Sequence, residues 1–247
     1  MNSPSVALTI AGFDPSGGAG VLADVRTFSA FGVNAVAAIS SLTFQNDREY
    51  FGAVHQSGVT VRSQVESLMV RYSIACAKTG MLPTVEVVRV VARLFRESEL
   101  PPPVVDPVLI SSSGKRLMDE DAIGVLINEL IPFCRLITPN IPEAETLAGM
   151  QITSEAHMGE AAARIRMMGA GAVLVKGGHL GGESSVDLLD DGGDVTVFRG
   201  ERIQGAGFHG SGCVLSAAIA AGLCKGMALQ NAVAEAKRFV LEQLKKR

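Results

Sequence analysis

The chain has 247 residues, of which 47% are hydrophobic and 19% are charged. This length suits one domain, with two domains as the alternative, and the composition excludes intrinsically disordered and collagen-like proteins. The 22 Lys and Arg residues nearly balance the 25 Asp and Glu residues, so the charge gives no indication of a nucleic-acid-binding protein.

Cysteine spacing and hydropathy indicate the compartment. The four cysteines, at positions 76, 134, 213 and 224, are too far apart for a zinc finger or ribbon, and they favour a reducing compartment. No segment has the pattern of a signal peptide or of a membrane-spanning helix. We therefore expect a cytoplasmic protein with neither a membrane nor a nucleic-acid partner.

Short runs rich in Val, Ile, Ala and Leu alternate with longer amphipathic segments, which is typical of βαβ units around a mainly parallel sheet. Strands are predicted at residues 6–11, 34–40, 75–79, 104–106, 136–138, 172–176, 185–189 and 195–198. The last two bracket the turn-rich run 190–193, which predicts a hairpin. Helices are predicted at residues 21–31, 59–72, 84–97, 120–130, 141–148, 154–168, 212–224 and 228–245.

The sequence contains no repeat and no linker between two halves, so we expect a single domain over residues 1–247 with a three-layer α/β/α architecture. Ligands of such sheets bind at the carboxyl ends of the strands. Glycine-rich and polar segments follow several of the predicted strands, so the candidate chemistry collects on one edge of the sheet.

The first glycine-rich segment, residues 12–20, follows the first predicted strand. Residues 18–23 fit the Gly-x-Gly-x-x-Ala form of a dinucleotide-binding fingerprint, but the second strand lacks the acidic residue that would hold a ribose. An NAD enzyme is therefore a distant alternative, and no Gly-x-x-x-x-Gly-Lys-Ser/Thr motif indicates a P-loop. A tight turn between strand and helix explains these glycines equally well.

The second glycine-rich segment, residues 205–213, leads directly into a helix of small residues. Backbone amides of Gly210, Ser211, Gly212 and Cys213 at the positive end of that helix could bind a phosphoryl oxyanion. The same field favours a thiolate at Cys213, which could then accept a proton or help to hold developing charge. We interpret the other three cysteines as buried thiols. His209 is either a loop-packing residue or a catalyst.

Polar side chains also follow the middle strands. Asp106 and Glu143 could hold Mg²⁺ beside a phosphate, while Asn140 and Glu143 could equally form the start of a helix. Lys176 ends an apolar strand, so its ammonium group needs an anion, for which a nucleotide phosphate is a natural candidate. Asp24 and Gln45 could together bind a ring that carries donors and acceptors, although a solvated Asp and a loop Gln explain them as well.

Motifs along nearly the whole chain closely resemble the hydroxymethylpyrimidine/phosphomethylpyrimidine kinases, which belong to the ribokinase-like superfamily. The resemblance is carried by residues 7–12, 14–20, 23–24, 45–46, 78–82, 105–108, 138–144, 176–179 and 209–213. It implies a three-layer α/β/α fold and a homodimer. It also implies ATP-dependent phosphorylation of 4-amino-5-hydroxymethyl-2-methylpyrimidine, and then of its monophosphate, in thiamine biosynthesis.

The resemblance also implies roles for individual residues. It assigns the pyrimidine pocket to Gly12, Asp24, Gln45, Met81 and Val108. The phosphoryl site comprises Gly210, Ser211, Gly212 and Cys213 together with Lys176. Asn140 and Glu143 lie in the nucleotide region, and Asp106 and Glu143 in the Mg²⁺ region.

This sequence departs from the family pattern at Phe13, Phe208 and Ser211. Phe13 neighbours the implied pyrimidine site, which affects the fit of the substrate. Two alternatives stay open at this point: a pyridoxal or pyridoxine kinase on the same fold, and a non-catalytic pyrimidine-binding protein.

Overall fold

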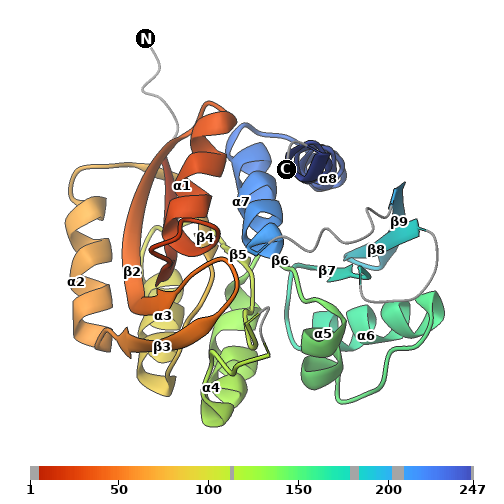
Figure 1. Ribbon diagram of the computed structural model, residues 1–247, viewed down its shortest axis with the longest axis horizontal. Coiled ribbons are helices and arrows are strands. Elements are labelled where there is room, and N and C mark those ends of the chain that lie inside the picture. Colours follow the sequence, from red (N-terminus) through yellow and green to blue (C-terminus); the bar gives the residue numbers. More distant parts are fainter. Residues whose placement is uncertain (1–5, 112–113, 179–183, 202–208, 246–247) are drawn as a thin grey trace.

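The computed structural model describes residues 6–111, 114–178, 184–201 and 209–245, and its strands join into one nine-stranded sheet (Figure 1). Six neighbouring strands are parallel, whereas β3 at one edge and β8 and β9 at the other are antiparallel. In spatial order the strands are β3 (Tyr50–His55), β2 (Asn34–Gln45), β1 (Val6–Phe13), β4 (Ile74–Thr79), β5 (Val104–Val105), β6 (Leu136–Ile137), β7 (Ala172–Lys176), β8 (Ser184–Asp191) and β9 (Asp194–Glu201). The predicted, mainly parallel sheet is confirmed.

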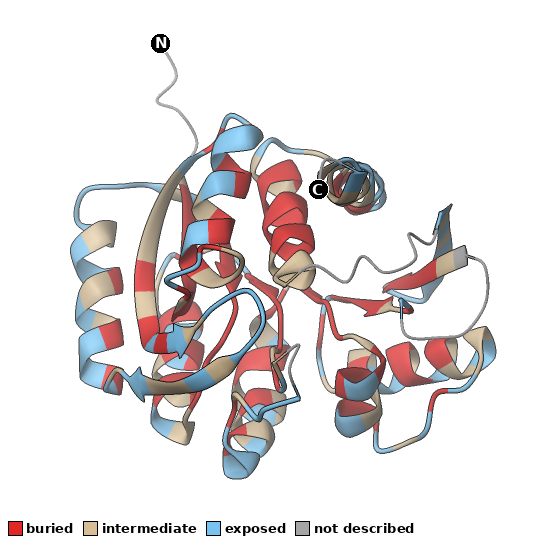
Figure 2. Ribbon diagram, in the orientation of Figure 1, coloured by how far each residue is buried: buried red, intermediate tan, exposed pale blue. Residues whose placement is uncertain are grey.

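Helices cover both faces of this sheet, which gives the predicted three layers. One apolar cluster joins the sheet to α1 (Gly20–Ala30), α7 (Ser211–Cys224) and α8 (Leu229–Lys245). The other joins it to α2 (Gly58–Met69), α3 (Val85–Glu97), α4 (Glu120–Val125), α5 (Ile141–Ala148) and α6 (Glu155–Met167). In Figure 2 the buried residues lie on the sides of these helices that face the sheet. No helix within the described residues is long and apolar enough to cross a membrane.

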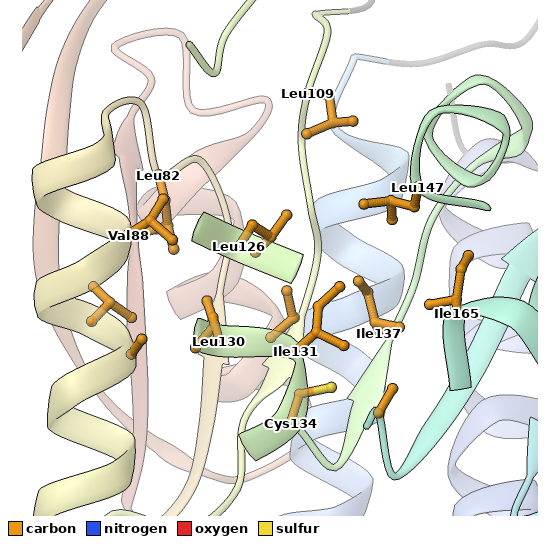
Figure 3. Packing of buried hydrophobic residues seen from close by; sticks show 14 of the residues in the cluster. Leu82, Val88, Leu109, Leu126, Leu130, Ile131, Cys134, Ile137, Leu147 and Ile165 are labelled. Atoms are coloured by element: carbon orange, nitrogen blue, oxygen red, sulfur yellow. The ribbon is translucent and has the colours of Figure 1, made fainter. Parts of the chain in front are cut away.

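The helix predicted at residues 120–130 is not one regular α-helix. The α-helical part ends at Val125 and continues as the π-helical turn Leu126–Leu130 and the 3₁₀ turn Ile131–Phe133. Pro132 has no N–H group to donate, so a regular helix cannot continue through it. The irregular segment buries Leu126, Leu130 and Ile131 completely, and Figure 3 shows them in the core between α3 and the sheet.

The sequence patterns missed strand β3 and ended β2 too early. β2 continues to Gln45, so Gln45 ends a strand rather than lying in a loop, and β3 pairs antiparallel with this extension. The apolar residues of the pair lie on its outer surface, where Phe44 is 53% and Phe51 is 65% exposed. β3 itself, with Phe51 and Val54 three residues apart, lacks the strict alternation of apolar and polar residues that predicts a strand.

The predicted hairpin of β8 and β9 is confirmed. Asp191 pairs with Asp194, which leaves Gly192 and Gly193 as a two-residue loop, with φ angles of 68° and 103°. Two consecutive residues with positive φ are what a type I′ hairpin turn requires.

Strand order reverses between β1 and β4, so the ligand site is expected at the carboxyl ends of these strands. From β1 the chain moves to β2 on one side, and it later returns to β4 on the other side of β1. The connecting helices α1 and α2 lie on opposite faces of the sheet. Such a reversal of strand order opens the ligand-binding crevice of α/β sheets.

Candidate active site

Gly12 and Met81 meet at the carboxyl ends of β1 and β4. A Cβ atom on Gly12 would lie 3.1 Å from Met81 Sδ, so a larger residue would crowd the methionine. Two hydroxyl groups of β2 hold the surrounding backbone: Ser40 Oγ donates to Met81 O at 2.5 Å, and Thr43 Oγ1 donates to Phe13 O at 2.8 Å. Gln45 follows Thr43 by two residues, so it lies on the same face of β2.

The second glycine-rich segment forms the start of α7. Gly210 is the N-cap, with a φ of 87°, and Ser211 is the first helical residue. The first hydrogen bond of the helix runs from Val214 N to Gly210 O at 3.0 Å, so the amides of residues 211–213 have no acceptor inside the helix. Such amides at a helix N-terminus form an anion-binding site. Residues 205–208 of this segment, with Phe208, lie outside the described residues.

Cys213 is a protonated thiol at neutral pH. Burial raises its pKa to about 11, although the charge of Lys78 and a hydrogen bond from the Gly20 amide both act to lower it. The expectation that the field of the helix makes Cys213 a thiolate is therefore wrong, because burial has the larger effect on the pKa of the thiol. A proton-accepting role needs a higher pH, or a further positive charge near the sulfur.

Lys176 ends β7 beside the first turn of α7. A Cβ atom on Gly212 would lie 3.2 Å from Lys176 Nζ, and this ammonium group is 3.0 Å from Asp106 Oδ1. Ser216 and Thr138 also donate to the Asp106 carboxylate, at 3.2 and 3.3 Å. Burial would raise the pKa of Asp106, but Lys176, Lys78 and these hydrogen bonds hold it below its usual range. The anion that Lys176 needs is thus supplied by Asp106.

Asn140 and Glu143 form the predicted start of α5. Asn140 Oδ1 accepts from Glu143 N, and Glu143 Oε2 accepts from Asn140 N, each at 2.9 Å, which completes a capping box. The other oxygen of Glu143 accepts from Leu109 N at 3.2 Å. Burial raises the pKa of Glu143, and the nearby charge of Asp106 raises it further, so the two carboxylates interact. The structural interpretation is confirmed, and the role in metal binding stays a prediction.

Val108 lies in the loop between Asp106 and Leu109 and has a φ of 44°. A positive φ is unfavourable for a β-branched residue, and such strained positions concentrate at functional sites. Val108 thus differs from its neighbours in its backbone conformation. Its assignment to the substrate pocket stays a prediction.

Asp24 is fully buried in a pair with Lys78, and the sequence patterns missed this lysine. Lys78 Nζ lies 2.9 and 2.8 Å from the two carboxylate oxygens of Asp24, and Thr9 Oγ1 donates to the same carboxylate at 2.6 Å. Both charged side chains are 0% exposed. Burial lowers the pKa of Lys78, but the charge and hydrogen bond of Asp24, together with other nearby acidic groups, outweigh that effect and raise it. Lys78 ends an apolar run, the same signal that indicated Lys176.

Comparisons with known proteins decide the family. Residues 14–247 match the family described as phosphomethylpyrimidine kinase. The chain is also 41% identical over 240 residues to the hydroxymethylpyrimidine/phosphomethylpyrimidine kinase of Rhizobium meliloti, and the match covers 96% of this chain and 89% of that protein. The chain belongs to the hydroxymethylpyrimidine/phosphomethylpyrimidine kinase family. It is a ribokinase-like phosphotransferase of thiamine biosynthesis.

Solved structures agree with the fold of this kinase. The phosphomethylpyrimidine kinase of Clostridium difficile is 35% identical, with a TM-score of 0.86, and the match covers 97% of this chain and 99% of that one. A Bacillus subtilis pyridoxal kinase, solved as an ADP complex, is also 35% identical, with a TM-score of 0.87 and coverage of 96% and 90%. The kinase thus resembles enzymes of two named activities.

We predict that Lys78→Met lowers the free energy of unfolding of this kinase by about 3–5 kcal/mol, because it leaves the buried Asp24 carboxylate without its cation. Urea denaturation measures the change. The exposed pair Arg62–Glu66, at 3.6 Å, supplies the control, since Arg62→Met should cost at most about 1 kcal/mol. A Lys78→Met protein as stable as the parent would contradict the charged pair.

Proposed function

We propose that the chain transfers the γ-phosphoryl group of ATP to the hydroxymethyl group of 4-amino-5-hydroxymethyl-2-methylpyrimidine, and then phosphorylates the monophosphate to the pyrophosphate. The named activities of its relatives support this substrate, and the ADP complex of the pyridoxal kinase supports ATP. The observation that carries the proposal is Lys176 Nζ beside the first turn of α7. We further propose that residues 1–247 act as one domain.

Phosphoryl transfer needs positioning and charge neutralisation more than covalent help from the protein. In our proposal the amides of Gly210, Ser211, Gly212 and Cys213 hold the moving phosphoryl group. The ammonium group of Lys176, which is paired with Asp106, also contacts a phosphate oxygen of ATP. Asn140 and Glu143 contribute to the nucleotide side of the site, at the start of α5.

Mg²⁺ fits the chemistry of this site. Asp106 and Glu143 are both buried, and the charge of Asp106 raises the pKa of Glu143, so a bound cation would reduce the repulsion between the two carboxylates. No group of three or more His, Cys, Asp or Glu side chains gathers as metal ligands within the described residues. A Mg²⁺ ion held by two carboxylates, phosphates and water needs no such group. When bound, the ion would neutralise charge on the phosphates.

The pyrimidine pocket in our proposal is the crevice lined by Gly12, Met81 and Val108, with Gln45 at the end of β2. Asp24 enters it only indirectly, because its two carboxylate oxygens bond Lys78 and Thr9 and its side chain is 0% exposed. Asp24 was predicted to contact the ring, and this role is corrected. Asp24 instead holds Lys78 and Thr9 beneath the surface of the protein.

We also propose a homodimer. Leu42 and Phe44 of β2 and Val54 of β3 are each at least 41% exposed. Leu42 pairs directly with Val54, so these apolar side chains share one face of the sheet extension. A second copy would cover that face, and light scattering would measure the mass of the assembly.

Incubation with ATP and Mg²⁺ against a panel of acceptors tests the activity. We expect phosphorylation of the hydroxymethylpyrimidine and of its monophosphate, each resolved by chromatography. Pyridoxal is the second candidate acceptor, because the solved ADP complex belongs to a pyridoxal kinase. Turnover of pyridoxal without turnover of the pyrimidine monophosphate would favour that activity. Binding of the pyrimidine without ATP consumption would indicate a non-catalytic binding protein.

We predict that Cys213→Ala lowers kcat/KM about 10²- to 10⁴-fold, the typical cost of losing a positioned proton acceptor. Because the pKa of the thiol is about 11, only a small fraction is thiolate at neutral pH. The thiolate fraction, and with it kcat/KM of the parent, should therefore rise about tenfold per pH unit between pH 7 and 9. Cys213→Ala should lose this rise. A parent profile that is flat over this range would instead assign the thiol to the anion hole.

We predict that Gln45→Ala raises KM for the hydroxymethylpyrimidine about tenfold or more while KM for ATP is unchanged, because a lost hydrogen bond leaves a ring atom without a partner. Steady-state kinetics with each substrate varied in turn measures both values. Asp47→Ala, at an exposed position in the turn after Gln45, is the control. An unchanged KM for the pyrimidine removes Gln45 from the pocket.

A further inference from the structure

The two glycine-rich segments are in direct contact with one another. A Cβ atom on Gly210 would lie 2.0 Å from Gly18 O, and one on Gly18 would lie 2.6 Å from His209 Cδ2. Real Cβ atoms do not approach other atoms so closely, so only glycine fits at position 210, and any larger residue at position 18 would displace the His209 ring. The loop of residues 14–20, after β1, is therefore the surface against which α7 begins.

One buried carboxylate spans this contact. Asp14 is 1% exposed and accepts hydrogen bonds from both segments. Within its own loop it accepts from Ser16 N at 2.9 Å, from Ser16 Oγ at 2.8 Å and from Ala19 N at 2.8 Å. From the second segment it accepts from His209 Nε2, at 2.9 Å. Asp14 therefore links the loop to the residue that precedes the N-cap of α7.

The direction of the hydrogen bond between Asp14 and His209 follows from charge. Burial would raise the pKa of Asp14, but the hydrogen bonds from Ser16, Ala19 and His209 outweigh it and lower the pKa. Asp14 is thus a carboxylate at neutral pH, and a carboxylate only accepts hydrogen bonds. His209 Nε2 must therefore carry the proton that the bond needs.

Both ends of this link lead to the phosphoryl site. His209 immediately precedes Gly210, the N-cap of α7. Ala19 immediately precedes Gly20, whose amide bonds Cys213 in the first turn of the same helix. A shift of Asp14 would consequently move the loop and the helix start relative to each other. The function proposed above uses neither Asp14 nor His209.

We propose that Asp14 and His209 are positioning residues, which lock the first turn of α7 against the loop of residues 14–20 so that the amides of residues 211–213 stay aligned on the transferred phosphoryl group. The inference rests on the proposed kinase function. It assigns no contact with the reacting atoms to either side chain. Because aligned donors act mainly in the transition state, their misplacement lowers kcat more than it raises KM.

The test uses the full chain with Asp14→Asn, His209→Phe, His209→Gln and the double variant Asp14→Asn/His209→Phe. We expect Asp14→Asn and His209→Phe to lower kcat about 10- to 100-fold, with KM for ATP changed less than about threefold. His209→Gln keeps an N–H donor and should recover most of kcat. The double variant should lose no more than the more damaging single variant, because the two side chains act through one shared hydrogen bond.

Asp194→Asn is the matched control, because Asp194 is exposed in the β8–β9 turn, at the opposite end of β7 from Lys176. It should keep the kcat of the parent. Hydrogen exchange followed by mass spectrometry supplies a readout that does not depend on turnover. Asp14→Asn should speed exchange of the Val214 amide, which donates the first hydrogen bond of α7 to Gly210 O, about tenfold and leave the sheet unchanged.

The outcomes separate the two proposals. A parent without kinase activity overturns the proposed function alone, and the exchange rates then decide the positioning role. Parental kcat together with parental exchange in Asp14→Asn and His209→Phe overturns the positioning pair. Equal loss in His209→Gln and His209→Phe, or additive losses in the double variant, also overturns it. If Asp14→Asn fails to fold, the two His209 variants give the answer.

Discussion

The start of α7 depends on a contact that only glycine allows. Gly210 adopts a φ of 87° and would carry a Cβ atom 2.0 Å from Gly18 O, so the backbone of one segment rests directly on the backbone of the other. This approach brings a helix N-terminus from late in the chain to the carboxyl end of β1. Lys176 and Asp106 come to that point from two further parts of the sequence, beside Cys213 in the first turn of α7.

Three basic side chains near this point each contact a buried carboxylate. Lys78 pairs with Asp24, Lys176 with Asp106 and His209 with Asp14, at distances of 2.8 to 3.0 Å. A buried charge without a partner is costly, and Lys78 and Lys176 each have an acid of their own in the protein. The pairs differ in access to solvent: the Lys78 side chain is 0% exposed, whereas that of Lys176 is 14% exposed. Lys176 is therefore the lysine that can exchange its partner for a phosphate oxygen.

Sequence patterns predicted the parallel strands, the helices and the β8–β9 hairpin because each has an apolar face or a glycine turn that is visible locally. They failed for β3, whose apolar side chains lie outward, and for the helix that becomes irregular at Leu126. At the site, spacing predicted the Asn140–Glu143 cap because both partners lie within one helical turn. It could not predict the bonds Lys78–Asp24 or His209–Asp14, whose partners are 54 and 195 residues apart. The pKa of Cys213 depends on burial by the whole fold, so local sequence gave its direction wrongly.

α7 carries the proposed anion site in its first turn and is also part of the core. It is buried from Val214 to Gly222, that is, along most of its length (Figure 2). In most enzymes, loops that carry chemistry can vary while the scaffold stays constant. Here one helix belongs to both the scaffold and the proposed site, and small buried side chains such as Ala217 and Ala218 pack it into the core. A substitution that changes the volume of a side chain in this part of the core would therefore shift α7 along with its first turn. Selection for turnover consequently constrains residues that never meet a substrate.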